Sequence, residues 1–381
     1  MEAYLDNAAT TRVADEVREI INKVMDIDYG NPSSRHEKGA VAAQYVKEAQ
    51  EVIAKTLKCE PKEIVFTSGG TESNNLALIG AAYANQRRGK HIISTGIEHA
   101  SVYNPLLFLQ ESGYEITFLS VDHAGHIDLE ELRKAIRPDT ILVSVMMVNN
   151  EMGAVEPIEE IGKLVKKANP EILFHVDAIQ AYGKMRISVK RCNIDLLSVS
   201  GHKIHGPKGV GFLYIRDRVK VKPIIYGGGQ QKDMRSGTEN VPGIAGLGVA
   251  AGLMYENHRE KVEHLELVKK AFVDGVTKLE GATCNSGDAP HIASISFRGI
   301  ERAEVLLHAL EARGVYCSSG SACSSNHPAI SGTLKAIGIE DELLNATLRF
   351  SFSIYSTVEE AEYAVRVIEE ELPKRRAFVK R

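Results

Sequence analysis

Short apolar runs alternate with amphipathic stretches between about residue 60 and residue 215. Seven of these runs are rich in Ile, Val, Leu and Phe and have the length of strands. They are residues 63–68, 91–95, 115–121, 140–148, 172–178, 194–200 and 209–215. Several stretches between them carry apolar residues at i, i+3 and i+4, the spacing of an amphipathic helix. This alternation predicts an α/β domain with a mainly parallel seven-stranded sheet flanked by helices.

The pattern changes after the segment RSGTENVPG, residues 235–243. A long stretch from Pro242 to Leu279 predicts a helix that leaves the first domain. The runs beyond it, among them IASISFRG and ATLRFSFS, predict a smaller α+β domain. We therefore expect a large domain over residues 15–257 and a small domain formed by residues 1–14 and 258–381.

The amino-acid composition of the chain narrows the classes of molecule that the protein could bind. The 381 residues include 46 Lys and Arg against 50 Asp and Glu, for a net charge of −4, which does not favour nucleic acid or an anionic membrane. The apolar runs are too short to span a bilayer, and the acidic first residues do not resemble a leader peptide. Five cysteines without a CxxC pair fit neither a disulfide framework nor a zinc knuckle. We expect a cytoplasmic protein that acts on a small molecule.

Ligands of parallel α/β folds bind where strands turn into helices. The turn FTSGGTESNN, residues 66–75, offers backbone amides and a hydroxyl at Gly69, Gly70 and Thr71. At a positive helix end these groups form a seat for phosphate. The alternative interpretation is a plain helix cap, with Ser68 or Thr71 as the capping residue. The turn lacks the lysine of a nucleotide-hydrolysing P-loop.

Lys203 lies in the turn SGHKIHGPKG, residues 200–209, directly after an apolar strand. An ordinary lysine, with a pKa of ~10.4, is protonated at neutral pH, but burial beside other cations lowers the pKa and produces a Schiff-base amine. Asp177 also ends a strand, where a buried carboxylate is costly unless it meets a cation. Singly, each is as well explained by a loop charge, a helix cap or a salt bridge. Together, a phosphate seat, a carboxylate and an amine are the three requirements of pyridoxal phosphate.

Other positions leave a structural and a functional interpretation open. His99 and Asn150 follow strand ends and fit either caps or the same site, where His99 would stack on the cofactor ring. Cys323 lies in a Ser- and Gly-rich loop and is either a harmless surface thiol or a nucleophile, whereas Cys317 ends a strand-like run and suits a core. Arg349, in a β-rich run, is either a paired structural arginine or a fork for a substrate carboxylate.

Two further patterns are weak. The HxxH motif at His202 and His205 has poor spacing for ligands on one helix face and no matched cysteine or carboxylate cluster, so we expect no metal site. A GxGxxA match at Gly246–Ala251 lacks a preceding strand, which argues against a dinucleotide site.

Taken together, these segments resemble the cysteine desulfurases of the NifS/IscS type, within the class V, fold-type I pyridoxal phosphate enzymes. The resemblance runs nearly end to end. It is carried by YLDNAATT, GNPSSRH, FTSGGTESNN, EHASV, VNNEMG, HVDAIQ, SGHKIHGPKGVG, GGGQ, RSGTENVPG, SSGSACSS and LRFSFS.

The resemblance implies a role for each residue of the site. Lys203 would be the Schiff-base lysine, His99 the ring-stacking acid and base, and Cys323 the sulfur acceptor. Asp177 would pair with the pyridine nitrogen, and Gln180 would contact the phenolic oxygen. The remaining roles are phosphate binding by Gly70, Thr71, Ser200 and His202, with Thr238 from the second subunit of a homodimer, and placement of the substrate carboxylate by Asn150 and Arg349.

The activity implied is removal of sulfur from L-cysteine, which leaves L-alanine and a persulfide on Cys323 for an acceptor such as an iron-sulfur scaffold. A selenocysteine lyase or another β-eliminating lyase is the alternative within the fold, and it would not need Cys323. A sulfur carrier without catalysis would not need Lys203. A nicotinamide oxidoreductase would need the Gly246 match to open after a strand.

Three departures from the family pattern bear on these expectations. Gly70 stands where relatives often have alanine, a change that we expect to be tolerated. Cys317 near the acceptor suggests a protective disulfide or a persulfide relay with Cys323. The sequence given stops soon after its last predicted helix, at PKRRAFVKR, so scaffold docking through an extended tail is not expected.

Overall fold

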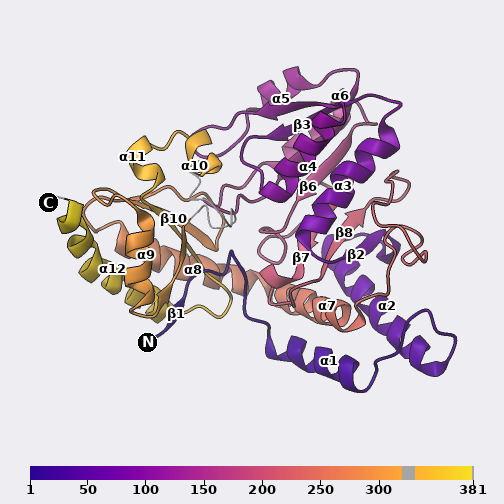
Figure 1. Ribbon diagram of the computed structural model, residues 1–381, viewed down its shortest axis with the longest axis horizontal. Coiled ribbons are helices and arrows are strands. Elements are labelled where there is room, and N and C mark those ends of the chain that lie inside the picture. The colour runs from indigo at the N-terminus through magenta and orange to yellow at the C-terminus, as the bar shows by residue number, and fades with distance from the viewer. Residues whose placement is uncertain (320–330, 380–381) are drawn as a thin grey trace.

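The computed structural model describes residues 1–319 and 331–379 (Figure 1). Seven strands form one large sheet in the order β2-β8-β7-β6-β5-β3-β4. β8 runs antiparallel to its neighbours β2 and β7, and all other neighbours pair in parallel. The bounds are β2 Ile64–Thr67, β3 His91–Thr95, β4 Glu115–Leu119, β5 Thr140–Met146, β6 Leu173–Asp177, β7 Leu196–Ser200 and β8 Gly211–Ile215. The predicted mainly parallel seven-stranded sheet is confirmed.

Both faces of this sheet are covered by helices, because side chains on each strand alternate between them. Val65 on β2 packs in the cluster formed with α3 and α4, whereas Phe66 packs in the cluster formed with α2, α6 and α7. Burial on both faces explains why most of the strands, apart from the partly exposed edge strand β4, consist mainly of apolar residues. The helices and turns of this part are α1 Asp15–Asp26, α2 Glu37–Leu57, η1 Pro61–Glu63, α3 Gly70–Asn85, α4 Ala100–Glu111, α5 Leu129–Ala135, α6 Ile158–Ala168, η2 Gly201–Lys203 and α7 Val241–Tyr255.

The stretch from Pro242 to Leu279 is two helices, not the one that its pattern predicts. α7 ends at Tyr255 and α8 spans His258–Val276. Between them Glu256 is extended and Asn257 has a φ of 47°, a left-handed conformation that asparagine adopts more readily than most residues. The two helices then serve different cores, because α7 packs on α1 and α2 while α8 packs on α12.

A second hydrophobic core lies under a four-stranded antiparallel sheet of order β12-β13-β10-β9. A separate parallel pair joins the N-terminal strand β1 to β11. The bounds are β1 Ala3–Tyr4, β9 Ala282–Cys284, β10 Ile292–Phe297, α9 Ala303–Glu311, β11 Val315–Tyr316, β12 Ser318–Ser319, α10 Gly332–Ala336, α11 Asp341–Leu344, β13 Thr347–Ser351 and α12 Val358–Val379. The division into domains at residues 14/15 and 257/258 stays our proposal. The second core combines Ala3 and Leu5 with apolar side chains that begin at Leu265 and end at Leu372.

The carboxyl ends of β5, β6 and β7 lie side by side, since Met146 pairs with Asp177 and Asp177 with Ser198. Figure 1 shows the smaller sheet on one side of this edge, with the N-terminal segment running between the two parts. Within residues 1–319 and 331–379, no helix combines the length and the apolarity that a membrane span requires.

Candidate active site

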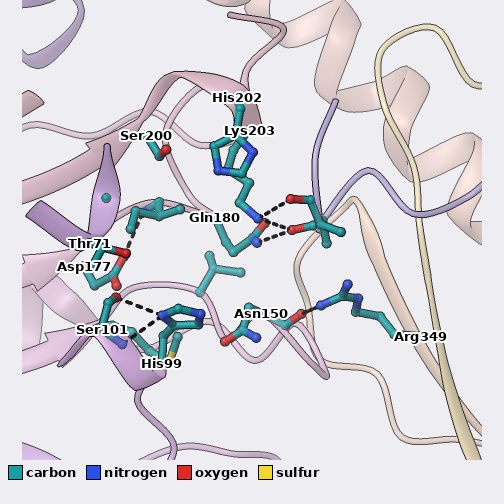
Figure 2. Close-up of a pocket in the computed structure, with 16 residues that line it drawn as sticks. Thr71, His99, Ser101, Asn150, Asp177, Gln180, Ser200, His202, Lys203 and Arg349 are labelled. Atoms are coloured by element: carbon teal, nitrogen blue, oxygen red, sulfur yellow. Dashed lines mark hydrogen bonds between the residues drawn. The ribbon is translucent and has the colours of Figure 1, made fainter. Parts of the chain in front are cut away.

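A cavity of about 260 Å³ opens at the carboxyl ends of β5, β6 and β7 (Figure 2). Every predicted site residue that the structure describes, except Thr238, lines it. These residues are Gly70, Thr71, His99, Asn150, Asp177, Gln180, Ser200, His202, Lys203 and Arg349. The structure thus brings together side chains from distant turns of the chain, as the rule for strand ends predicts.

One end of the cavity is the start of α3. Gly69 precedes the helix with a φ of 148°, a conformation that favours glycine, and no side chain caps the helix. The backbone N–H groups of Gly70, Thr71 and Glu72 donate to no acceptor among the described residues. The hydroxyls of Thr71 and Ser200 line the same cavity. Open amides at a positive helix end, with hydroxyls beside them, suit a phosphate group.

Gly70 is matched to its neighbour Ile179. A Cβ placed at Gly70 would lie 2.2 Å from Cδ1 of Ile179. An alanine at this position would therefore require the tip of the isoleucine side chain to move, which costs little because that end is flexible. The structure thus gives a physical reason to expect that glycine and alanine are both tolerated at position 70.

Another part of the cavity lining is a largely buried polar chain that includes Asp177, Ser101 and His99 (Figure 2). Asp177 accepts hydrogen bonds from Asn74 Nδ2 and from the backbone N–H of Ile179, both at 2.9 Å. The same Asn74 nitrogen donates to Ser101 Oγ, which lies 2.8 Å from Nδ1 of His99. Burial raises the pKa of Asp177, and no ion pair involving it occurs among the described residues. The cation predicted to face Asp177 is therefore not supplied by a side-chain ion pair in this part of the chain.

Lys203 reaches the centre of the cavity from the turn after β7. Its Nζ donates to the carbonyl oxygens of Ala8 and Ala9 at 2.5 and 2.7 Å. A second buried amine, Lys184, donates to the backbone oxygen of Lys203 at 2.6 Å and is only 6% exposed. Burial, together with the charge of Lys203, lowers the pKa of Lys184 to about 7. Lys184, which the sequence did not reveal as part of the site, is thus a second basic side chain beside Lys203.

His202 and Gln180 complete the surroundings of Lys203. Burial, reinforced by the charge of Lys203, lowers the pKa of His202 to about 4, so the imidazole is neutral at pH 7. Gln180 Nε2 donates to the same Ala8 oxygen at 2.9 Å, and its Oε1 lies 3.2 Å from Nε2 of His291. These contacts hold the amide beside the lysine.

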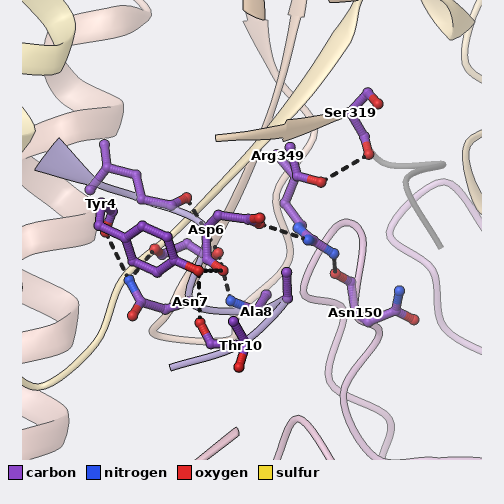
Figure 3. A network of polar contacts seen from close by, with 12 residues as sticks. Tyr4, Asp6, Asn7, Ala8, Thr10, Asn150, Ser319 and Arg349 are labelled. Atoms are coloured by element: carbon purple, nitrogen blue, oxygen red, sulfur yellow. Dashed lines mark hydrogen bonds and ion pairs between the residues drawn. The ribbon is translucent and has the colours of Figure 1, made fainter. Parts of the chain in front are cut away.

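Arg349 enters the cavity from β13 and is 3% exposed (Figure 3). One of its terminal nitrogens, Nη1, donates to the backbone oxygen of Asn150 at 2.9 Å, and the other, Nη2, forms an ion pair with Asp6 Oδ1 at 3.0 Å. Nε is buried and has no hydrogen-bond partner among the described residues. Arg349 thus forms a structural ion pair and also lines the cavity, so the two interpretations from the sequence are compatible.

Of the predicted site residues that the structure describes, Thr238 does not line this cavity. Thr238 is exposed and follows Arg235, which forms an ion pair with Glu72. Cys323 lies outside the described residues. Cys317, which does lie within them, is partly buried and packs against the second core, and burial strongly raises the pKa of its thiol.

Sequence reasoning missed the N-terminal contribution to the cavity. Ala8 and Ala9 act through backbone oxygens and Asp6 through an ion pair, and none of these residue types carries chemistry that a pattern reveals. The available signal was the segment YLDNAATT itself, which carries the family resemblance without an evident reason in its composition.

The structure also bears on the two weak patterns. Gly246 lies inside α7, where an added Cβ would press on Ile21, so the GxGxxA match is a site of helix packing. Across residues 1–319 and 331–379, no group of three or more His, Cys, Asp or Glu side chains is arranged to hold a metal ion.

Comparison with known proteins identifies the relatives of this chain. Residues 3–363 match the family described as Aminotransferase class-V. The chain is 43% identical to the cysteine desulfurase IscS of Dictyoglomus turgidum, over 99% of this chain and 96% of that protein. It is 44% identical to the mitochondrial cysteine desulfurase of Saccharomyces cerevisiae, over 96% of this chain and 74% of that protein.

Solved structures give the same result. A NifS-like protein superposes with a TM-score of 0.93 at 39% identity, over 98% of this chain and all of that one. The structure of SspA in complex with cysteine superposes with a TM-score of 0.81 at 37% identity, over 93% of this chain and 100% of that one.

Proposed function

The chain belongs to the aminotransferase class-V family, among the cysteine desulfurases, and on this premise we propose that it uses pyridoxal phosphate to move sulfur from L-cysteine to Cys323. L-Cysteine and the Cys323 thiol give L-alanine and a Cys323 persulfide. The carbon–sulfur bond of the substrate breaks, a sulfur–sulfur bond forms, and no external oxidant is needed.

One observation carries the proposal. Side chains from six separate turns or strands of the sequence, each with a role in such a reaction, line the same cavity. If Lys203 were only a solvated loop lysine, the start of α3 only a capped helix end and Arg349 only a structural arginine, nothing would require them to line the same cavity.

The lining fits the cofactor at both ends. The open amides of α3, with Thr71 and Ser200, would hold the phosphate. Asp177, buried and without an ion-pair partner among the described residues, would hold the protonated pyridine nitrogen, because a buried carboxylate is stabilised by such a cation. When bound, pyridoxal phosphate supplies an electron sink for the bonds to the substrate Cα.

The protein's own groups then bind the substrate and handle protons. Arg349 and Asn150 would receive the substrate carboxylate, since a guanidinium and a carboxylate match in geometry and charge. Lys203 would carry a proton to and from the substrate at Nζ. His99 would act on the substrate through Nε2, because Nδ1 accepts the backbone N–H of Ser101 at 3.1 Å and the ring proton of the neutral imidazole therefore lies on Nε2.

The proposal extends to assembly and location. We propose a homodimer in which Thr238, exposed in the single chain, binds the phosphate of the partner subunit's site. An acceptor such as an iron-sulfur scaffold would take the persulfide sulfur. A cytoplasmic location is supported by four cysteines that are free among the described residues, as expected in a reducing compartment.

The test is alanine release from L-cysteine by the cofactor-loaded protein. The wild type and Cys317→Ala are expected to release alanine and to carry a persulfide detectable by mass spectrometry, whereas Cys323→Ala is expected to do neither at a comparable rate. Cys317→Ala is the matched control, because it removes a thiol six positions away. If Cys323→Ala released alanine as fast as the wild type, the protein would be a β-eliminating lyase and not a desulfurase that uses Cys323.

A further inference from the structure

The N-terminal segment Asp6–Thr11 contacts both reactive ends of the cavity (Figures 2 and 3). Its Asp6 pairs with Arg349, and the oxygens of Ala8 and Ala9 accept from Lys203. Thr11 is fixed in turn, because its Oγ1 donates to the backbone oxygen of His202 at 2.9 Å. The segment therefore joins the strand that carries Arg349 to the turn that carries Lys203.

The anchoring of this segment is tight at its first residues. Asn7 Nδ2 donates to the Ser351 oxygen at 3.0 Å, and the N–H of Ala8 donates to Ser351 Oγ at 2.8 Å. Ser351 lies two residues from Arg349 on β13, on the same face of the strand. Asp6 is consequently held at a fixed position relative to the guanidinium.

The orientation of Arg349 rests on two acceptors. Asp6 accepts from Nη2, and the backbone oxygen of Asn150 accepts from Nη1. These two contacts fix the plane of the guanidinium, whereas Nε has no hydrogen-bond partner among the described residues. A long side chain with several rotatable bonds loses little further freedom on binding when it is already held in this way.

Asp6 also balances charge. Arg349 is 3% exposed, and a guanidinium that deep is destabilised without a counter-ion. A second carboxyl that the charge of Arg349 influences is that of Glu151, whose Oε2 instead accepts from Ser331 Oγ at 2.5 Å. Asp6 therefore provides the ion pair that keeps the arginine buried before substrate arrives.

We propose that Asp6 is a positioning residue that presents Arg349 to the substrate carboxylate. This rests on the proposed function, in which Arg349 receives that carboxylate. Asp6 touches neither the substrate nor the cofactor in this proposal, and it acts through the guanidinium alone. Its removal affects ligands that carry a carboxylate and spares those that lack one.

The experiment compares L-alanine with ethylamine, which lacks the carboxylate, as ligands of the cofactor-loaded dimeric enzyme, by isothermal titration calorimetry. For Asp6→Ala we expect the Kd of L-alanine to rise about tenfold or more while that of ethylamine stays within twofold. For Asp6→Asn, which keeps an oxygen acceptor at the same place, we expect an L-alanine Kd no more than about threefold above that of the wild type. In turnover, Asp6→Ala should raise the KM for L-cysteine with a smaller effect on kcat.

The outcomes separate the inference from its premise. If the wild type binds L-alanine no better than ethylamine, the assignment of Arg349 in the proposed function is wrong. If the wild type discriminates and Asp6→Ala discriminates equally well, Asp6 has no positioning role. Equal weakening of both ligands would show general damage and also overturn the proposal. Should Asp6→Ala not fold, Asp6→Ser, whose hydroxyl is too short to reach Nη2, replaces it with the same expected results.

Discussion

The carboxyl group of Glu98, next to His99, is predicted to make the stability of the protein fall as pH rises. Its Oε1 accepts from the N–H of Met146 and from Thr95 Oγ1, both at 2.9 Å, whereas Oε2 is buried with no partner among the described residues. Burial, and to a lesser degree the neighbouring carboxylate of Asp177, raises the pKa of Glu98 from its ordinary 4.5 to about 8. The folded protein therefore holds this proton at pH values where the unfolded chain has lost it.

The size of the effect follows from the two pKa values. A folded-state pKa above the unfolded value stabilises the fold at low pH, and this contribution is lost as pH rises from 4.5 towards 8. The slope is at most about 1.4 kcal/mol per pH unit and is smaller near each pKa, so the loss between pH 5 and pH 8 is about 3 to 4 kcal/mol. Glu98→Gln keeps the Oε1 acceptor and cannot ionise, so it should match the wild type near pH 5 and exceed its stability at pH 8.

The assay is thermal unfolding of wild type and Glu98→Gln at several pH values from 5 to 8. Glu362→Gln, which removes an exposed carboxyl on α12, is the control and should run parallel to the wild type. A stability difference between Glu98→Gln and wild type that does not grow with pH would refute the reasoning, because the carboxyl would then be ionised in the folded protein at little cost.

Three further outcomes are expected. Lys184→Met should stabilise the protein most below pH 7, because the wild type must bury an ammonium there. The gain in stability should fade as pH rises from about 7 towards 10.5. A gain in stability that is the same at pH 6 and pH 10 would contradict this. Asp195→Ala should destabilise the fold by about 3 kcal/mol in urea unfolding, because it leaves Lys166 and Arg216 without their buried counter-ion, and an unchanged midpoint would disprove that role. Asp177→Asn should lower kcat for alanine release by about a hundredfold or more at unchanged fold, and near-normal turnover would exclude it as the partner of the pyridine nitrogen.

The sheet was predictable from the sequence because strands that are buried on both faces consist mainly of apolar residues. The location of the cavity was predictable for a similar reason, since Asp177 and Lys203 are charged residues at the ends of apolar strands. Asn74 was not predictable as part of the site, because in the sequence it reads as an ordinary polar position on a helix, yet it is fully buried and joins Asp177 to Ser101.

What the sequence could not predict depends on contacts between distant segments. Lys184 stands in a turn that reads as solvent-exposed, and only the packing of α7 and the Lys203 turn around it makes it buried. The break at Asn257 is likewise invisible in the helical pattern, because two helices that serve different cores continue one another in periodicity. Asp6 and Arg349 are separated by 343 positions, so no local pattern connects them.

The N-terminal strand sets the order in which this site can be completed during synthesis. β1 pairs with β11 and Asp6 with Arg349, so Asp6 waits for a partner that is made 343 positions later. At about 5–20 residues per second, that wait is roughly 20–70 s. The large sheet can form within that interval, but Arg349 cannot take its place in the cavity until the C-terminal part of the chain has been made.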